Sequence, residues 1–300
     1  MTDFSVGIVG LDSLGDALNR RFDAQGIGNT VTDINPRLLQ AHIAGGGSAP
    51  AGSPYDLAQF CDLIFLAETN DDTLRESVLG PIGLVHAVRA GTVLVDMSDA
   101  SPQAGAAIAR ALYSKGVIWI EATPVGGIAE LRSGTLTLLT AGPADTLASI
   151  APVLRTFAAK VLQLGDLGAG PLGKALASAF AALSVAIHTE MLIIAKMARL
   201  DTTALLEALP LLAPDGGVPA LLASEVLAGR SETTMSSKRL QDDIGRVLDA
   251  ARTAGVPAMF LPLLQAASLA AMHSPQATGG ALDVARWMAD NAGADFGLSG

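Results

Sequence analysis

The chain has 300 residues, half of them hydrophobic and 16% charged, and its formal net charge is −10. This composition favours a well-filled core over disorder, and the negative charge disfavours nucleic acid and anionic membranes as partners. Cys61 is the only cysteine, so no disulfide can form within the chain and a reducing compartment is expected.

Two further observations favour a cytoplasmic protein. The chain does not open with a basic stretch followed by a long apolar segment, as a secretory signal peptide would. The most membrane-like stretch, residues 175–187, has about 13 residues and is flanked by charged or polar side chains, so it is too short to span a bilayer.

The first predicted elements are a strand and a helix joined by a glycine-rich turn. Residues 4–9 form a short apolar run, and Gly10 and Gly15 occupy the first and third positions of a G-x-G-x-x-G fingerprint. Apolar residues then recur at helical spacing, so the helix would direct its N-terminal amides at a dinucleotide pyrophosphate. Asp12 replaces the middle glycine. The residues expected at the cofactor are those of the turn: Gly10, Leu11, Asp12, Ser13, Leu14 and Gly15.

A second predicted strand, residues 29–34, ends at Asp33. A carboxylate at this position accepts hydrogen bonds from the adenosine ribose hydroxyls and repels a 2′-phosphate. Ile34 follows, where an arginine would be needed to bind that phosphate. These two residues predict NAD as cofactor and make NADP the less favoured alternative; a solvated turn is the other interpretation of Asp33.

Strands and helical stretches alternate up to about residue 165, which predicts an α/β fold with a parallel, doubly wound sheet. Beyond Gly165 the chain is rich in Ala and Leu at helical spacing, beginning with a long helix over about 171–199. We therefore predict a dinucleotide-binding Rossmann domain over 1–165 and an all-helical domain for substrate binding and oligomerisation over 166–300. The further strands are expected at residues 63–67, 92–96, 117–121 and 136–140.

Three segments carry a family resemblance. They are V-D-M-S-D-A-S-P at 95–102, E-A-T-P-V-G-G-I-A-E-L-R-S-G-T-L at 121–136, and G-A-G-P-L-G-K-A-L-A-S at 168–178. In this order and spacing the chain resembles the β-hydroxyacid dehydrogenases, a family that includes 3-hydroxyisobutyrate dehydrogenase and is related to 6-phosphogluconate dehydrogenase. The resemblance covers essentially the whole chain and implies a Rossmann domain followed by a helical domain.

The resemblance also implies roles for single residues. Lys174 matches the catalytic lysine that serves as general acid/base. Gly126 and Gly127 match the paired glycines whose amides hold the substrate carboxylate, and Ser98 lies near the nicotinamide. Further cofactor contacts are expected at Glu68, Thr69, Asp99 and Asp242.

The residues around Lys174 agree with this role. A lysine can transfer protons near neutral pH only if its pKa is lowered, by burial or by the positive end of a helix. Lys174 comes just after three glycines, at the start of a long apolar helix, where both effects can act. The alternative is a lysine that extends from a helix start into solvent.

Five positions depart from the family pattern. Val125 replaces a serine that binds substrate, and Ser178 replaces an asparagine one helical turn after Lys174. Asp12, Asp99 and Asp242 introduce acidic side chains, the last in place of a cofactor-side lysine. A pocket lined by Val125 and Ser178 would be roomier and less polar than the family norm, which argues against the smallest anionic hydroxy acids.

The sequence therefore predicts an oxidoreductase that transfers a hydride between NAD(H) and a hydroxy acid or related carbonyl compound. The substrate is expected between the domains, against Gly126, Gly127, Lys174 and Ser178. Two alternatives remain: an imine reductase of similar architecture, and a degenerate NAD-binding protein without turnover. The four histidines are scattered, so no metal site is expected. An apolar stripe on the long helix predicts a homodimer or homotetramer.

Overall fold

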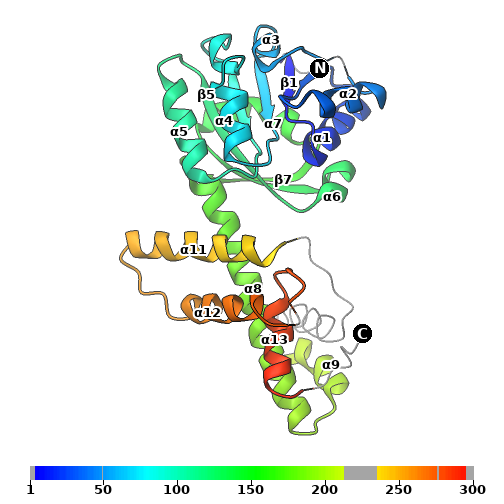
Figure 1. Cartoon of the computed structure of the whole chain (residues 1–300), viewed down its shortest axis with the longest axis vertical. Coiled ribbons are helices and arrows are strands. Elements are labelled where there is room, and N and C mark those ends of the chain that lie inside the picture. Colours follow the sequence, from blue (N-terminus) through cyan, green and yellow to red (C-terminus); the bar gives the residue numbers. More distant parts are fainter. Residues whose placement is uncertain (1–3, 49, 213–234, 276, 295–300) are drawn as a thin grey trace. The chain divides into compact units, whose positions relative to one another are not determined.

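A computed structural model describes residues 4–48, 50–212, 235–275 and 277–294. The chain divides into two compact units, Met1–Lys174 and Ala175–Gly300 (Figure 1). Helix α8 (Ala169–Met197) contributes residues to both units, and Lys174 is the last residue of the first.

The first unit is built on a seven-stranded sheet of order β2-β1-β3-β4-β5-β6-β7. Strands β1 to β5 are mutually parallel, as expected for a Rossmann fold. Their carboxyl ends therefore share one edge, where dinucleotides bind in such sheets. The strand bounds are β1 Val6–Val9, β2 Asn29–Thr32, β3 Leu63–Leu66, β4 Val93–Asp96, β5 Ile118–Val125, β6 Leu136–Ala141 and β7 Ala158–Gly165.

The predicted parallel, doubly wound sheet is confirmed for β1 to β5, but the strand that follows β5 departs from it. Strand β6 pairs with β5 in the antiparallel direction, and β7 is parallel to β6. Only residues 126–135 connect β5 to β6, which is shorter than the dozen or so residues that a parallel crossover needs. Strand β7 was not predicted because it is a largely exposed edge strand without a clear apolar alternation.

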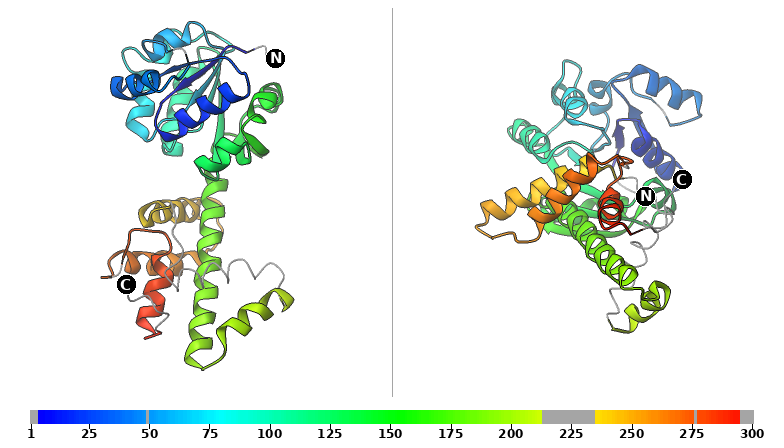
Figure 2. Two further views of the ribbon diagram at one scale, coloured as in Figure 1. Left: turned by 90° about the vertical axis from the view of Figure 1, so that its right-hand side faces the viewer. Right: turned by 60° about the horizontal axis from the view of Figure 1, so that its bottom comes forward.

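Helices cover both faces of this sheet (Figures 1 and 2). One apolar core lies between the sheet and α1, α6 and α7, and its centre is a cluster of three rings, Phe22, Phe65 and Phe157, with centroids 5.4–5.9 Å apart. The other core lies under α3, α4 and α5. The helix bounds are α1 Ser13–Ala24, α2 Pro36–Ala44, α3 Pro54–Ala58, α4 Asp71–Leu79, α5 Pro102–Tyr113, α6 Ile128–Ser133 and α7 Ala144–Leu154.

The second unit is helical throughout its described residues, apart from an isolated bridge between Ser236 and Gly280, as the sequence predicted. Besides α8 it contains α9 Thr202–Leu212, α11 Ser237–Thr253, α12 Leu261–Met272 and α13 Asp283–Asn291. Two small cores hold these helices together. Val185 and Leu192 of α8 belong to one core, and Ala179 of α8 belongs to the other.

Helix α8 has 29 residues and agrees with the long helix expected over about 171–199 (Figure 2). Its apolar part is longer than the 13-residue stretch that was judged too short to span a bilayer. Among the described residues, α8 is the one helix long and apolar enough to cross a membrane. Core helices of soluble proteins meet the same two criteria, and α8 contributes side chains to both cores of the helical unit.

Candidate functional site

The turn between β1 and α1 can be built only with glycine at two positions. Gly10 has φ +94°, and a Cβ atom there would lie 2.8 Å from the carbonyl oxygen of Ala67. A Cβ atom on Gly15 would lie only 1.8 Å from the carbonyl oxygen of Gly10. The first glycine therefore permits the left-handed turn, and the last allows α1 to pack closely against β1.

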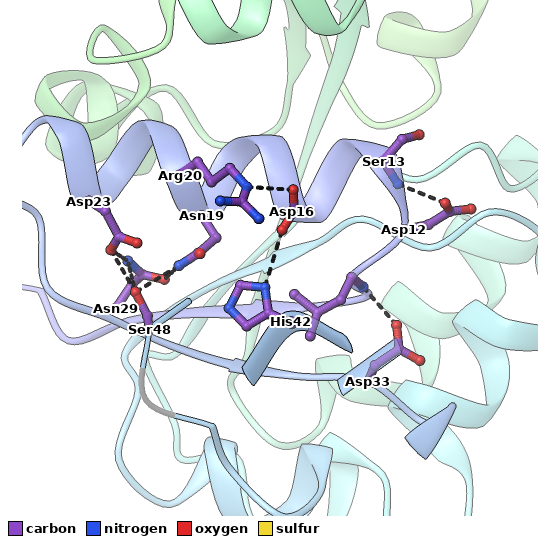
Figure 3. A network of polar contacts seen from close by, with 11 residues as sticks. Asp12, Ser13, Asp16, Asn19, Arg20, Asp23, Asn29, Asp33, His42 and Ser48 are labelled. Carbon is purple, nitrogen blue, oxygen red and sulfur yellow. Dashed lines mark hydrogen bonds and ion pairs between the residues drawn. The ribbon is translucent and has the colours of Figure 1, made fainter. Parts of the chain in front are cut away.

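Asp12 is the N-cap of α1 and is exposed. Its carboxylate accepts a hydrogen bond of 2.7 Å from the backbone N–H of Ser13, as Figure 3 shows. A helix N-terminus is an anion-binding position, so the side chain of Asp12 already occupies part of the place where a pyrophosphate would bind.

Asp33 lies just beyond the end of β2, and its side chain is directed at the glycine-rich turn (Figure 3). One carboxylate oxygen accepts the N–H of Leu11 at 2.7 Å, and the other accepts the N–H of Asn35 at 2.6 Å. Asp33 is only 8% exposed, so these bonds hold the carboxylate in place. The partly exposed Ile34 follows it and offers no cation.

These residues fit a bound dinucleotide. The turn has the two obligatory glycines, the helix start supplies amides for phosphate oxygens, and Asp33 stands where a ribose acceptor is needed. One side chain does not fit a bound pyrophosphate: Asp12 stands at the middle position of the glycine fingerprint, between Gly10 and Gly15.

The next two parallel strands bring three more predicted cofactor residues, Glu68, Thr69 and Asp99, to the same edge. Glu68, after β3, is 6% exposed, and its carboxylate accepts the hydroxyl of Ser77. Burial raises the pKa of Glu68. Because this side chain is directed into the core, any cofactor contact here falls to the Glu68 backbone or to the exposed Thr69.

After β4, Asp96 organises the loop that carries Ser98. The Asp96 carboxylate accepts both the backbone N–H and the hydroxyl of Ser98, at 2.9 and 2.6 Å. Burial raises the pKa of Asp96 to about 6, against the opposing effect of the two Ser98 bonds. The exposed Asp99 donates its backbone N–H to the carbonyl of Glu68, which links the two loops.

The paired glycines follow β5. Gly126 has φ +122°, and Gly127 is the N-cap of α6. The Gly127 N–H, expected to hold a substrate carboxylate, here donates to the carboxylate of Glu130 at 2.8 Å. This bond lowers the pKa of Glu130. The Val125 side chain beside the pair is 38% exposed and offers no hydroxyl.

Lys174 is partly buried and lies near the start of α8. Ser178 follows it by one helical turn, so both residues lie on the same side of α8. Glu121 of β5 had no predicted role, although it opens the E-A-T-P-V-G-G segment. Its carboxylate accepts backbone N–H groups at the start of α8.

Asp242 belongs to the second unit. It lies on α11 and forms an exposed ion pair of 3.1 Å with Lys238, one turn earlier. Lys238 is therefore paired within its own helix. No group of His, Cys, Asp or Glu residues in the described part of the chain is arranged to hold a metal ion.

The parallel strands, the two obligatory glycines and the acidic residue after β2 define a dinucleotide-binding oxidoreductase fold. Residues 5–165 match the NAD binding domain of 6-phosphogluconate dehydrogenase. The chain belongs to this family and is an NAD-binding oxidoreductase of the hydroxyacid dehydrogenase type.

Known proteins resemble it along most of its length. The L-threonate dehydrogenase of Cupriavidus necator is 27% identical over 280 residues, which is 93% of each chain. The solved 3-hydroxyisobutyrate dehydrogenase of Mycobacterium tuberculosis, with L-serine, superposes with a TM-score of 0.79 at 19% identity and covers 96% of this chain and 99% of its own. An imine reductase variant from Myxococcus stipitatus in complex with NAD+ has a TM-score of 0.61 at 17% identity, covering 96% and 100%.

Proposed function

We propose that this protein oxidises a hydroxy acid of the threonate class, with NAD preferred over NADP and Lys174 as the general acid/base. The main supporting observation is the position of Lys174. It lies near the start of α8, in the same compact unit as the glycine-rich turn and Asp33.

The roles of the residues follow from their chemistry. When bound, NAD supplies a hydride acceptor. The amine of Lys174 would take the proton of the substrate hydroxyl during oxidation and return it during reduction. The amides of Gly126 and Gly127 would bind the substrate carboxylate, and Ser98 would lie near the nicotinamide.

The other cofactor contacts are also part of the proposal. The turn from Gly10 to Gly15 would bind the pyrophosphate, and Asp33 with Ile34 would bind the adenosine ribose and disfavour a 2′-phosphate. The additional contacts proposed are the Glu68–Thr69 loop, Asp99 and Asp242.

The preference for a larger, hydroxylated acid has two sources. Ser178 leaves more space than an asparagine would, and Val125, although larger than a serine, offers no hydrogen bond to the substrate. The relative from Cupriavidus necator is named for L-threonate. Asp99 supplies a carboxylate that could accept a hydrogen bond from an additional substrate hydroxyl.

We also propose that the protein acts in the cytoplasm as a homo-oligomer formed through its helical domain, residues 166–300, with residues 1–165 as the cofactor domain. The net charge of −10 argues against nucleic acid or an anionic membrane as partner.

The test is a substrate panel. L-threonate and 3-hydroxyisobutyrate are each supplied with NAD and with NADP, and NADH or NADPH formation is followed. A cyclic imine is tested in the reductive direction. The proposal predicts the highest kcat/KM for L-threonate with NAD. Imine reduction without hydroxy acid oxidation would identify an imine reductase, and a preference for NADP would refute the role of Asp33.

A further inference from the structure

Glu121 connects the middle of β5 to the start of α8. One oxygen of its carboxylate accepts the N–H of Gly168 at 2.7 Å, and the other accepts the N–H of Gly170 at 3.3 Å. The side chain is only 5% exposed. Burying a carboxylate destabilises the fold unless the carboxylate is hydrogen-bonded. Here each of its two oxygens accepts a backbone N–H.

The bond to Gly170 completes the hydrogen bonding of the first turn of α8. The first four N–H groups of a helix have no partner within it. Here Ala169 and Leu172 donate to backbone carbonyls of the preceding residues, and Pro171 has no N–H. Gly170 is the remaining donor, and Glu121 is the acceptor that the structure provides for it.

Both ends of this connection reach the proposed site. Lys174 follows Gly170 by four residues, about 6 Å along the helix axis. On the other side, β5 continues from Glu121 directly to Gly126 and Gly127. One strand thus presents the glycine pair and fixes the helix turn that precedes the lysine.

The negative charge of Glu121 lies at the start of α8, the helix that carries Lys174. The pKa of Glu121 is raised by burial and by the charge of Asp96, and lowered by the two glycine N–H bonds. Asp96 is its partner in the β4–β5 register and is the carboxylate whose charge acts on it. A carboxylate at the first turn of α8 offsets the positive end of the helix, which favours the protonated form of an amine on the following turn.

We propose that Glu121 is a positioning residue for Lys174: by capping the first turn of α8 it fixes the lysine relative to the glycine pair and sets its protonation. The expected effect on turnover rests on the proposed catalytic role of Lys174, whereas the expected effect on the Lys174 titration does not.

The test uses Glu121→Gln, which keeps the shape, removes the charge and leaves one acceptor for two N–H donors. The reactivity of Lys174 towards acetic anhydride is measured across the neutral and alkaline pH range by peptide mass spectrometry. We expect its pKa to fall by about half a unit. In turnover with L-threonate, we expect kcat to fall about 10- to 100-fold, with little change in the Kd for NAD.

Two further variants separate positioning from a purely structural role. Asp283→Asn also removes a buried carboxylate that accepts two backbone N–H groups, but on α13, and should leave the Lys174 titration unchanged. If Glu121→Gln does not fold, Gly170→Ala disturbs the same contact, because its Cβ would lie 3.3 Å from the carboxylate of Glu121; it would also lie 3.1 Å from the carbonyl oxygen of Leu139 and from the hydroxyl of Thr123. It should shift the titration in the same direction.

The outcomes of the Glu121 test can be distinguished from the outcomes of the test of the proposed function. The positioning role would be refuted if the Lys174 titration is unchanged in Glu121→Gln, or in Gly170→Ala if only that variant folds. This holds even if the variant is less stable than the wild type. Full turnover in Lys174→Ala would refute the catalytic role of the lysine, but would leave the titration test of Glu121 valid.

Discussion

At the scale of single residues, Asp12 is the feature that most directly opposes cofactor binding. Its carboxylate is exposed and already accepts the Ser13 N–H at the start of α1. A pyrophosphate must displace it and approach its charge. We expect Asp12→Gly to tighten NAD binding by about 2- to 10-fold, measured by calorimetric titration, with a smaller effect at high salt.

Asp12→Asn is the matched variant, because it removes the charge and keeps the bulk. If the charge dominates, both variants should bind NAD more tightly. Weaker binding by Asp12→Gly would show that Asp12 makes a favourable contact with the cofactor.

The sequence predicted these residues to different extents. Gly10, Gly15 and Asp33 could be found from spacing alone, because backbone sterics and ribose recognition demand those residue types at those positions. The partners of their side chains could not be found. Leu11 and Asp33 are 22 residues apart and Gly168 and Glu121 are 47 apart, so each contact depends on how the strands and helices pack.

At the scale of elements, the capping of α6 competes with the proposed substrate contact. Gly127 donates its N–H to Glu130, as in a capping box. A substrate carboxylate must replace that side chain. We therefore expect Glu130→Ala to lower the KM for L-threonate by about 2- to 5-fold with little change in kcat, because a competing anion is removed.

The control for this variant is Asp145→Ala, which removes another exposed first-turn carboxylate, on α7. It should not change KM. A higher KM in Glu130→Ala would mean that Glu130 orders the Gly127 turn for binding and does not compete with the substrate.

The strands and helices themselves were largely predictable. The parallel half of the sheet and the helical second unit follow from apolar runs and helical spacing. The direction of β6 and the existence of β7 were missed, since a short connection and an exposed edge strand leave little signal in a sequence.

At the scale of the whole molecule, the helical unit exposes many apolar side chains. Phe180, Ile187 and Ile194 of α8 are 72%, 54% and 61% exposed, and Leu263 of α12 is 69% exposed. Large exposed apolar surface of this kind favours association. Sedimentation at micromolar concentration is expected to give at least twice the chain mass of 30.4 kDa.

Ile187→Lys should shift this equilibrium towards monomer. Ile43→Lys changes a similarly exposed isoleucine, 48% exposed, on α2 of the first unit and should leave the mass unchanged. A wild-type protein that sediments at 30.4 kDa would contradict the oligomer.

Lys174 is the residue on which the proposed activity depends, as the general acid/base of an NAD-linked dehydrogenase. The direct measurement is kcat with L-threonate and NAD for Lys174→Ala, with the Kd for NAD in parallel and Lys196→Ala, further along α8, as control. We predict that Lys174→Ala lowers kcat about 10²- to 10⁴-fold, the range for loss of a general acid or base, while NAD binding and Lys196→Ala remain near wild type. Near-normal turnover by Lys174→Ala would contradict the role of Lys174 as general acid/base.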